Sequence, residues 1–304
     1  MYDIIIVGSG PAGITASIYA KRSNKKTLVF ESANPGGKIV DATLIENYPA
    51  LPHISGFDYA NNIYNQAKEM GVEFKFERVN EIKDYTDHKE VITSKGSYDC
   101  KSIILATGNE NRNIGLSGEK ELIGKGISYC ATCDGSFYKG KDVCVVGGGN
   151  IAVGDAIYLN DIASKVYLVY RKSELSAEGI LVDKLKEAKN VEVILNSSVI
   201  KLNGKEKLES VTVKNNEDEY DLKVSGLFVA VGRNPQNENF KNLIKTDEKG
   251  FIIAGEDTHT NIPGIFAAGD NRVKALRQLV TACSDGANAA MEAIKYVNNN
   301  KWEC

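Results

Sequence analysis

A glycine-rich motif between two short apolar runs constrains the fold of this chain more than any other feature. Residues 3–7 (DIIIV) contain a short apolar, β-branched run, GSGPAG follows at 8–13, and a helical stretch continues to about Arg22. A second short apolar run ends in Glu31. This order predicts a βαβ unit whose glycines let a pyrophosphate approach the helix N-terminus, while the acid accepts hydrogen bonds from a ribose. We therefore predict a dinucleotide site at Gly8, Gly10, Gly13 and Glu31.

The same pattern occurs again in the middle of the chain. The second motif, GGGNIA at residues 147–152, lies 139 positions after the first and also follows a short apolar run. Tyr170 stands where Glu31 stands in the first repeat. We predict an α/β fold with two Rossmann-like dinucleotide-binding domains, each doubly wound and three-layered, the second inserted into the first.

Polar stretches near 109–118 and 233–242 separate the two repeats and are typical of linkers. We expect a first domain built from 1–113 and 242–304, and a central domain at 114–241 that carries the second motif. A helix is expected from about Leu276 to Tyr296.

The bulk composition excludes several functional classes. The 304 residues carry a formal charge of -3, which favours neither a nucleic-acid partner nor a membrane surface. The start of the chain resembles no signal peptide, and no apolar stretch is long enough for a membrane span. We therefore expect a cytoplasmic protein, in which the six cysteines do not indicate a disulfide framework.

One cysteine pair stands out, in SYCATCDG at residues 128–135. A zinc site needs four ligands, but the other cysteines and the histidines show no matching spacing, so we expect no metal. Thiol–disulfide exchange needs one thiolate that attacks and a second thiol that resolves the mixed disulfide. Cys130 and Cys133, at an expected helix start, supply both, and we favour a redox-active pair.

Together these features resemble the low-molecular-weight thioredoxin reductases, nearly from end to end. The resemblance rests on VGSGPAG, GGKI, ENYP, ILATG, GISYCATCDG, GGGNIAV, GIFAAGD and ALRQLVTACSDGANAA, in this order. It implies a flavoprotein disulfide oxidoreductase with FAD in the first domain, assembled as a homodimer. It also implies a central domain that swings to expose the dithiol to thioredoxin, the electron acceptor.

The resemblance implies which residues hold FAD. Those expected at its ADP half are Gly8, Gly10, Pro11, Ala12, Gly13 and Glu31, with Arg78 and Val79 near the adenine. Those expected to line the isoalloxazine are Gly37, Lys38, Ile39 and Asn47, with Arg277 and Gln278 against it at a helix start. Thr107 and Gly108 would support the phosphates, and Asp270 the ribityl chain.

The resemblance also implies roles around the dithiol. Cys133 would face the C4a position of the flavin and accept its electrons. Cys130 would be the more exposed sulfur, which attacks the thioredoxin disulfide. Asp134 would protonate the departing thiolate; its alternative role is that of a turn or cap carboxylate.

The second dinucleotide motif departs from the family pattern. NADPH-dependent members read approximately GGGNSA and then HRRxxxR, a basic cluster around the 2′-phosphate, whereas this chain has GGGNIA and YRKSELS. Lys172 and Ser176 replace two arginines, and lysine lacks the bidentate fork of arginine. NADH would require an acid where Tyr170 stands. We expect ferredoxin or another NADPH-independent donor, as in the ferredoxin-dependent flavin thioredoxin reductases; the alternative is NADPH bound by a weakened clamp.

Other hypotheses explain less of the sequence. A ferredoxin–NADP reductase of related fold would lack the dithiol, and a redox-inert flavin-binding protein would have no reason to keep CATCDG. Around the dithiol, Lys120, Lys125, Lys139 and Lys141 are balanced by Glu119, Glu121, Asp134 and Asp142, so the sequence locates no basic docking patch for an acidic ferredoxin.

The tail NNNKWEC is expected to fray; alternatively, Trp302 covers the flavin face that a nicotinamide would use. The sequence assigns no role to Cys304.

Overall fold

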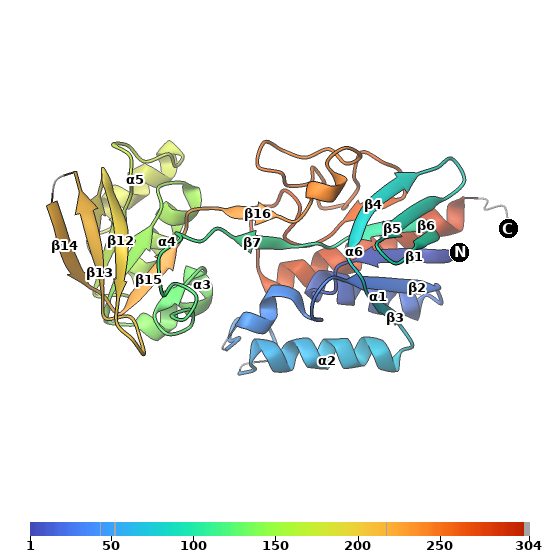
Figure 1. The fold of residues 1–304 in the computed structure, drawn as a ribbon, viewed down its shortest axis with the longest axis horizontal. Coiled ribbons are helices and arrows are strands. Elements are labelled where there is room, and N and C mark those ends of the chain that lie inside the picture. The colour runs from blue at the N-terminus through green and yellow to red at the C-terminus, as the bar shows by residue number, and fades with distance from the viewer. Residues whose placement is uncertain (43, 52, 217, 301–304) are drawn as a thin grey trace. The chain divides into compact units, whose positions relative to one another are not determined.

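The computed structural model describes residues 1–42, 44–51, 53–216 and 218–300, which fold into two compact units (Figure 1). One unit contains Met1–Glu110 and Asn234–Cys304, and the other contains Asn111–Arg233. The second unit is therefore an insertion into the first. Trp302 and Cys304 lie outside the described residues.

The boundaries between the units differ from those expected at 113 and 241. Residues 234–241 belong to the first unit because Phe240 packs into its core and Asn237 accepts a hydrogen bond from Thr107. The two connecting segments pair as a short two-stranded ladder formed by β7 (Asn109–Asn111) and β16 (Arg233–Pro235).

A seven-stranded sheet forms the centre of the first unit, in the order β3-β2-β1-β6-β5-β4, with β17 also paired to β6. Strands β1, β2, β3, β6 and β17 run parallel, whereas β4 and β5 continue antiparallel from β6. The strands are β1 Tyr2–Val7, β2 Thr27–Glu31, β3 Glu73–Phe76, β4 Val79–Asp84, β5 Lys89–Thr93, β6 Ser97–Leu105 and β17 Ile265–Ala267.

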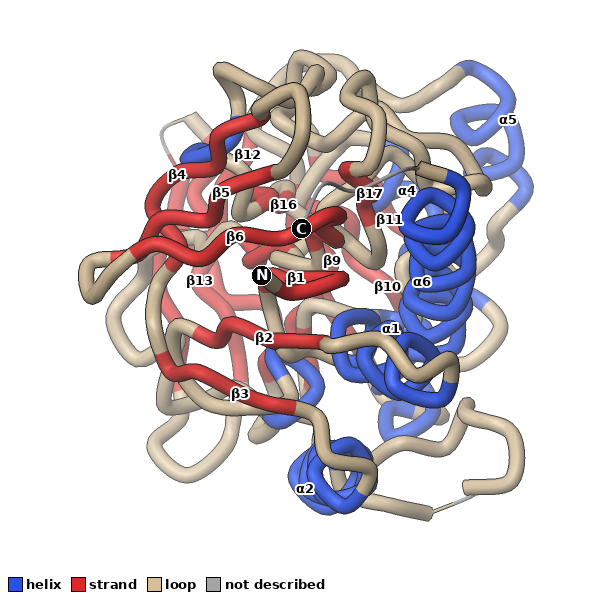
Figure 2. The backbone as a smooth tube through the Cα atoms, turned by 90° about the vertical axis from the view of Figure 1, so that its right-hand side faces the viewer, coloured by secondary structure: helices blue, strands red, loops and turns tan. Residues whose placement is uncertain are grey.

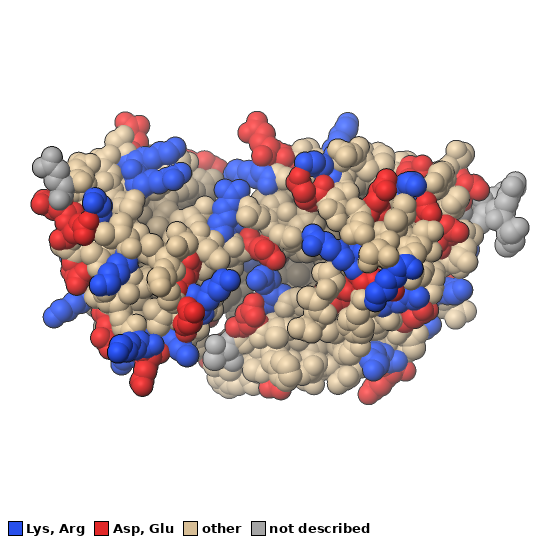
Figure 3. Space-filling model, in the orientation of Figure 1, with Lys and Arg blue, Asp and Glu red and all other residues tan. Residues whose placement is uncertain are grey.

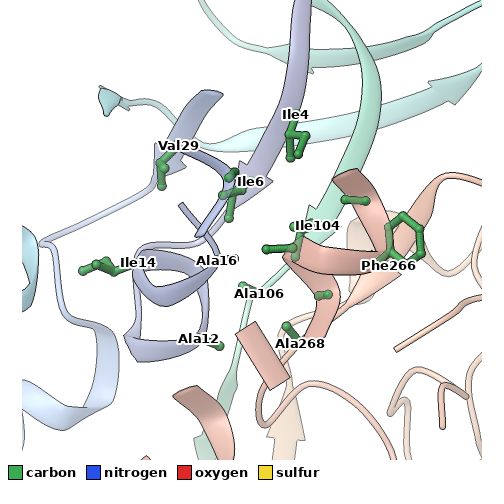
Figure 4. Packing of buried hydrophobic residues seen from close by; sticks show 14 of the residues in the cluster. Ile4, Ile6, Ala12, Ile14, Ala16, Val29, Ile104, Ala106, Phe266 and Ala268 are labelled. Carbon is green, nitrogen blue, oxygen red and sulfur yellow. The ribbon is translucent and has the colours of Figure 1, made fainter. Parts of the chain in front are cut away.

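Both faces of this sheet are buried, which explains the uninterrupted apolar run of β1. Ile4 and Ile6 pack with residues of α1 (Pro11–Arg22), α2 (Gly56–Glu69) and α6 (Leu279–Asn299) on one face. Figure 2 shows α1 and α6 along one side of the strands, and Figure 4 shows Ile4 and Ile6 in this cluster. Ile5 and Val7 point to the other face, where residues of β4, β5 and the segment 240–254 cover them. The unit has three layers, of which only one outer layer is helical. Two short 3-10 helices, η1 (Gly37–Asp41) and η3 (Glu238–Phe240), complete it.

The second unit has its own parallel sheet, in the order β11-β10-β9-β15-β8, and a three-stranded antiparallel sheet, β12-β13-β14. Val143 and Val145 of β9 pack with the helices, whereas Cys144 packs with β12 and β13. The elements are β8 Ile127–Ser128, α3 Ala131–Asp134, η2 Gly135–Tyr138, β9 Asp142–Val146, α4 Asn150–Asn160, β10 Lys165–Val169, α5 Gly179–Glu187, β11 Val191–Ile194, β12 Ser197–Asn203, β13 Ser210–Asn215, β14 Asp218–Lys223 and β15 Gly226–Val229. No helix in the described ranges is long and apolar enough to cross a membrane.

Candidate active site

The first glycine-rich loop connects β1 to the start of α1, and its shape depends on the absence of side chains. Gly8 has φ +106°, and a Cβ there would lie 2.3 Å from the carbonyl oxygen of Ala106. A Cβ on Gly13 would lie 1.9 Å from the oxygen of Gly8, so the helix packs directly on the loop. A Cβ on Gly10, by contrast, would meet only the oxygen of Gly36, at 3.9 Å. The loop is therefore tight on its inner side and open at Gly10, as a pyrophosphate site requires.

Glu31 at the end of β2 is bonded to this loop. Its Oε2 accepts hydrogen bonds from the backbone nitrogen of Ser9 at 3.0 Å and from the Ser9 hydroxyl at 2.6 Å, and its Oε1 accepts from the nitrogen of Ala33 at 2.8 Å. Each carboxylate oxygen can accept further bonds, so the residue fits a ribose. Sequence reasoning missed Ser9, although its place between two motif glycines could have indicated it.

A second group of expected FAD residues follows β6 and β17. The Thr107 hydroxyl donates to Asn237 at 2.9 Å and accepts from the side-chain nitrogen of Asn271 at 3.0 Å. Asn271 is fully buried, and its Oδ1 has no hydrogen-bond partner among the described residues. Gly108, at φ +67°, has open space where a side chain would stand. A buried acceptor without a donor and an open glycine both fit a polar ligand here.

Buried ion pairs hold the turn that contains Asp270. Asp285 of α6 accepts from the backbone nitrogen of Gly269 at 2.9 Å, from Arg272 at 2.8 and 2.9 Å, and from Lys274 at 2.8 Å. Burial by itself raises the pKa of Asp285, but the bonds from the two cations lower it overall. Sequence reasoning missed these three charged residues.

The start of α6 brings together residues far apart in the sequence. Asn47 donates to the side-chain oxygen of Gln278 at 3.0 Å, and Gln278 caps the helix in a reciprocal capping box with Thr281. The Arg277 guanidinium lies over the Phe251 ring, 4.2 Å from its centroid. Asn47, Arg277 and Gln278, all expected at the isoalloxazine, therefore lie around one helix end.

The other expected FAD residues lie on the same unit. Gly37, Lys38 and Ile39 form η1, and a Cβ on Gly37 would lie 3.2 Å from the Cα of Gly10. Pro11 and Ala12 open α1, and Gly286 of α6 approaches so closely that a Cβ there would lie 2.1 Å from the Ala12 oxygen. Arg78 is exposed, whereas the Val79 side chain is buried in the core beside it.

The dithiol lies in the second unit, where Cys130 and Cys133 form a disulfide with a Cα–Cα distance of 5.3 Å. Cys130 precedes α3 and Cys133 lies within it; the backbone nitrogen of Cys133 donates to the Cys130 oxygen at 3.2 Å. Cys133 is exposed and Cys130 only half-buried, which reverses the expected order of exposure. The backbone nitrogen of Cys130 is bonded back to Ser128 at 3.0 Å. The described residues contain no group of three or more metal-binding side chains.

Asp134, the residue after Cys133 at the end of α3, is bonded to Ser128. The Ser128 hydroxyl donates to Asp134 Oδ2 at 2.6 Å. Burial raises the pKa of this carboxyl, although the hydrogen bond from Ser128 lowers it in part. The environment therefore favours the protonated acid more than bulk water does, as a proton donor requires.

The second glycine-rich loop keeps the shape of the first. Gly147 has φ +144°, and a Cβ there would lie 2.4 Å from the oxygen of Ala230, matching the contact of Gly8 with Ala106. The side chain that contacts this loop differs from the Glu31 carboxylate that contacts the first one. The Tyr170 ring lies against Gly148, where a Cβ would be 2.3 Å from it, and its hydroxyl is 3.1 Å from the Ser176 hydroxyl. Ser176 in turn donates from its nitrogen to the Gly148 oxygen at 2.7 Å. A neutral ring and hydroxyl thus take the place of the carboxylate that holds the first loop.

Comparisons with known proteins agree with this geometry. The model of the family described as "Pyridine nucleotide-disulphide oxidoreductase" matches residues 2–286. The chain belongs to this family. A thioredoxin reductase of Listeria innocua is 42% identical over 304 residues, covering 99% of this chain and 95% of the relative. The structure of a thioredoxin reductase from Streptococcus pyogenes superposes with a TM-score of 0.93 at 41% identity, covering 99% of both chains.

A second solved structure comes from a thioredoxin reductase with another electron donor in its name. The ferredoxin-flavin thioredoxin reductase of Clostridium acetobutylicum is 31% identical, with a TM-score of 0.54, over 98% of this chain and 99% of its own. The resemblance to thioredoxin reductases is confirmed, and this oxidoreductase is a flavoprotein that acts on disulfides.

Proposed function

We propose that this oxidoreductase is an FAD-dependent thioredoxin reductase, in which the Cys130–Cys133 pair carries electrons to a thioredoxin disulfide. One observation carries the proposal: a CxxC disulfide lies beside a carboxyl whose pKa is raised, in a chain that matches thioredoxin reductases over almost its full length. The first unit would hold FAD, which, once reduced by the electron donor, would supply the electron pair for this disulfide.

The residues of the second unit then complete the exchange. The Cys130 thiolate attacks one sulfur of the thioredoxin disulfide, and the other sulfur leaves as a thiolate that Asp134 protonates. We assign the attack to Cys130 because its sulfur lies 3.4 Å from the Thr132 hydroxyl, which can stabilise a thiolate. Cys133 next attacks the Cys130 sulfur, which reforms the internal disulfide and releases thioredoxin with two reduced sulfurs. The enzyme dithiol loses two electrons, and thioredoxin gains them.

The donor in this proposal is ferredoxin or another carrier other than NADPH. Tyr170 and Ser176 lie against the second glycine loop, and Arg171 is the one arginine that remains of the three in the family pattern, which leaves a weakened clamp for a 2′-phosphate. No carboxylate stands at this position for the ribose of NADH either. The likeness to a ferredoxin-flavin thioredoxin reductase supports the same donor.

A second candidate is NADPH bound through a weakened clamp. The preserved shape of the loop at Gly147 and the greater identity to the Listeria innocua thioredoxin reductase favour it. Losing one charge-assisted contact to phosphate costs about 1.5–3 kcal/mol, or roughly ten- to a hundredfold in affinity.

An anaerobic titration separates these candidates. The purified yellow protein is mixed with reduced ferredoxin, NADPH or NADH, and bleaching of the flavin band is followed before oxidised thioredoxin is added. We expect ferredoxin to bleach the flavin and thioredoxin to restore its colour, with little bleaching by either nucleotide. Rapid bleaching by micromolar NADPH would establish the second candidate, and a colourless protein that retains no flavin would refute the main proposal.

The proposal includes a homodimer in the cytoplasm. Size-exclusion chromatography with light scattering tests the dimer, and a monomeric FAD-loaded protein would contradict it.

A further inference from the structure

A cavity of about 320 Å³ in the second unit is lined in part by η2, which directly follows the dithiol helix α3. It has no part in the chemistry proposed above. Phe137 and Tyr138 of η2, directly after the dithiol, form one wall, and Leu208 contributes to the opposite one. Lys125, Lys141 and Lys207 also line it. We propose that this cavity binds a small organic anion, with a phosphate or carboxylate group among the lysines and a planar or apolar part against Phe137.

Two glycines hold the walls in place. The Tyr138 ring lies on Gly226, where a Cβ would be 2.5 Å from it, and it packs edge-on against Phe228 with 5.3 Å between centroids. Leu208 lies on Gly126, where a Cβ would be 2.4 Å from the leucine Cβ. Because both walls are fixed by close backbone contacts, the cavity is formed before any ligand arrives.

The charged side chains that line the cavity are all positive. Its lining holds three lysines and no carboxylate, in a chain whose net charge is -3. Within the described ranges, none of the three ammonium groups forms an ion pair. The Lys141 ammonium donates to the Phe137 oxygen at 3.0 Å and lies over the Tyr138 ring, 5.8 Å from its centroid. Three neighbouring cations repel one another, and an anion among them relieves that repulsion.

Two of the acids that the sequence suggested as balancing charges form hydrogen bonds with other groups. Glu119, which the sequence suggested as a balancing charge, is buried and accepts from the backbone nitrogens of Ile114 and Gly115 and from the Tyr129 hydroxyl. Asp142 accepts from Ser164. Two of the balancing carboxylates are therefore already bonded to other groups of the folded unit.

The aromatic wall indicates the kind of anion. Phe137 is 43% exposed although it is a large apolar residue, and it lies beside the lysines. A bare inorganic ion would leave this ring in contact with water, whereas an anion with a ring or short apolar chain would cover it. We therefore expect phenyl phosphate to bind more tightly than inorganic phosphate.

Calorimetric titration of the FAD-loaded protein at constant ionic strength tests the proposal, with phenyl phosphate and inorganic phosphate as probes. We expect saturable binding of both, and a loss of at least tenfold in affinity in the double variant Lys125→Gln/Lys207→Gln. Lys139→Gln/Lys205→Gln is the matched control, because both lysines are exposed but do not line the cavity, and its affinity should be unchanged. Phe137→Ser should abolish the preference for phenyl phosphate and leave inorganic phosphate binding intact.

Three outcomes would overturn the proposal. The first is no saturable binding of either probe, and the second is an equal loss of affinity in the control variant. The third is a raised KM for thioredoxin in Lys125→Gln/Lys207→Gln without any binding of the probes, which would assign these lysines to an acidic protein surface. Flavin absorbance of each variant verifies that it is folded, and none of these measurements depends on which donor reduces the flavin.

Discussion

The Ser128 hydroxyl donates a 2.6 Å hydrogen bond to the carboxylate of Asp134, and so connects β8 to the end of the redox helix. The same hydroxyl accepts from the backbone nitrogen of Cys130 at 3.0 Å. One serine thus controls both the position of the dithiol and the acidity of its neighbouring carboxyl.

The variant Ser128→Ala should shift the pH dependence of thioredoxin reduction. Burial raises the pKa of Asp134 and the bond from Ser128 lowers it, so removing that bond raises the pKa further. Because the protonated acid is the proton donor, the alkaline decline in activity should move to higher pH, as measured by steady-state rates across the pH range. Ser136→Ala, at an exposed position outside this contact, is the control. An unchanged pH profile in Ser128→Ala would argue against Asp134 as the donor.

Replacing either redox cysteine with serine should abolish disulfide reduction and leave the flavin bound. In Cys130→Ser or Cys133→Ser, thiol–disulfide exchange lacks its attacking or its resolving sulfur, and turnover should fall at least about a thousandfold. The flavin absorbance should persist, because the residues that we propose to hold FAD belong to the other unit. Cys283→Ser, at a free cysteine beside the Tyr59 hydroxyl, should keep its activity. Full activity in either redox variant would refute the assignment.

Gly148→Ala should destabilise the second glycine loop. The added Cβ would lie 2.3 Å from the Tyr170 ring, and overpacking of this kind costs about 1–3 kcal/mol. Adding Tyr170→Ala should recover part of the loss, since the two residues are in contact. Gly154→Ala on α4, where a Cβ meets nothing within 4 Å, should be neutral or slightly stabilising. Thermal unfolding of the purified variants measures these effects, and equal midpoints for Gly148→Ala and Gly154→Ala would contradict the close contact.

Asp285→Asn should destabilise the first unit by about 3–5 kcal/mol, because Arg272 and Lys274 would remain buried without their counter-charge. The pKa of Asp285 is lowered in the folded protein, so its stabilising effect is complete above the ordinary carboxyl pKa and is lost as pH falls through the lowered value. The variant should therefore lose less stability on acidification than the wild type.

Glu256→Gln is the matched control for this prediction. Its carboxylate also contacts Arg272, at 3.2 Å, but the side chain is 86% exposed, so the loss should be below about 1 kcal/mol. Unfolding midpoints at neutral and acidic pH, with FAD retention as a second measurement, distinguish the two variants. Equal effects would show that burial of the Asp285 ion pairs contributes little.

Several features could be predicted from the sequence because they depend on local patterns. The two βαβ units follow from apolar runs, glycine spacing and the residue at the second strand end, all of which are contiguous in the chain. Asn47 and Gln278 were both expected at the flavin, but only by family resemblance. Their 3.0 Å hydrogen bond joins segments 231 positions apart, which no local pattern predicts.

Other features could not be predicted because burial decides them. Glu119 and Lys120 are adjacent and opposite in charge, so the sequence predicts two surface charges that cancel. The fold buries Glu119 and leaves Lys120 exposed. The expected order of exposure of Cys130 and Cys133 is reversed in the fold, where Cys133 is exposed and Cys130 half-buried.

The sequence by itself determined that this chain has two dinucleotide folds, one redox-active cysteine pair and an altered second loop. Each of these features depends on residues that are neighbours along the chain. Only the tertiary structure decided which charges are buried, which hydroxyl is bonded to Asp134 and which lysines share a cavity. Desolvation and electrostatic interaction act through space, and folding alone sets the distances between residues that are remote in sequence.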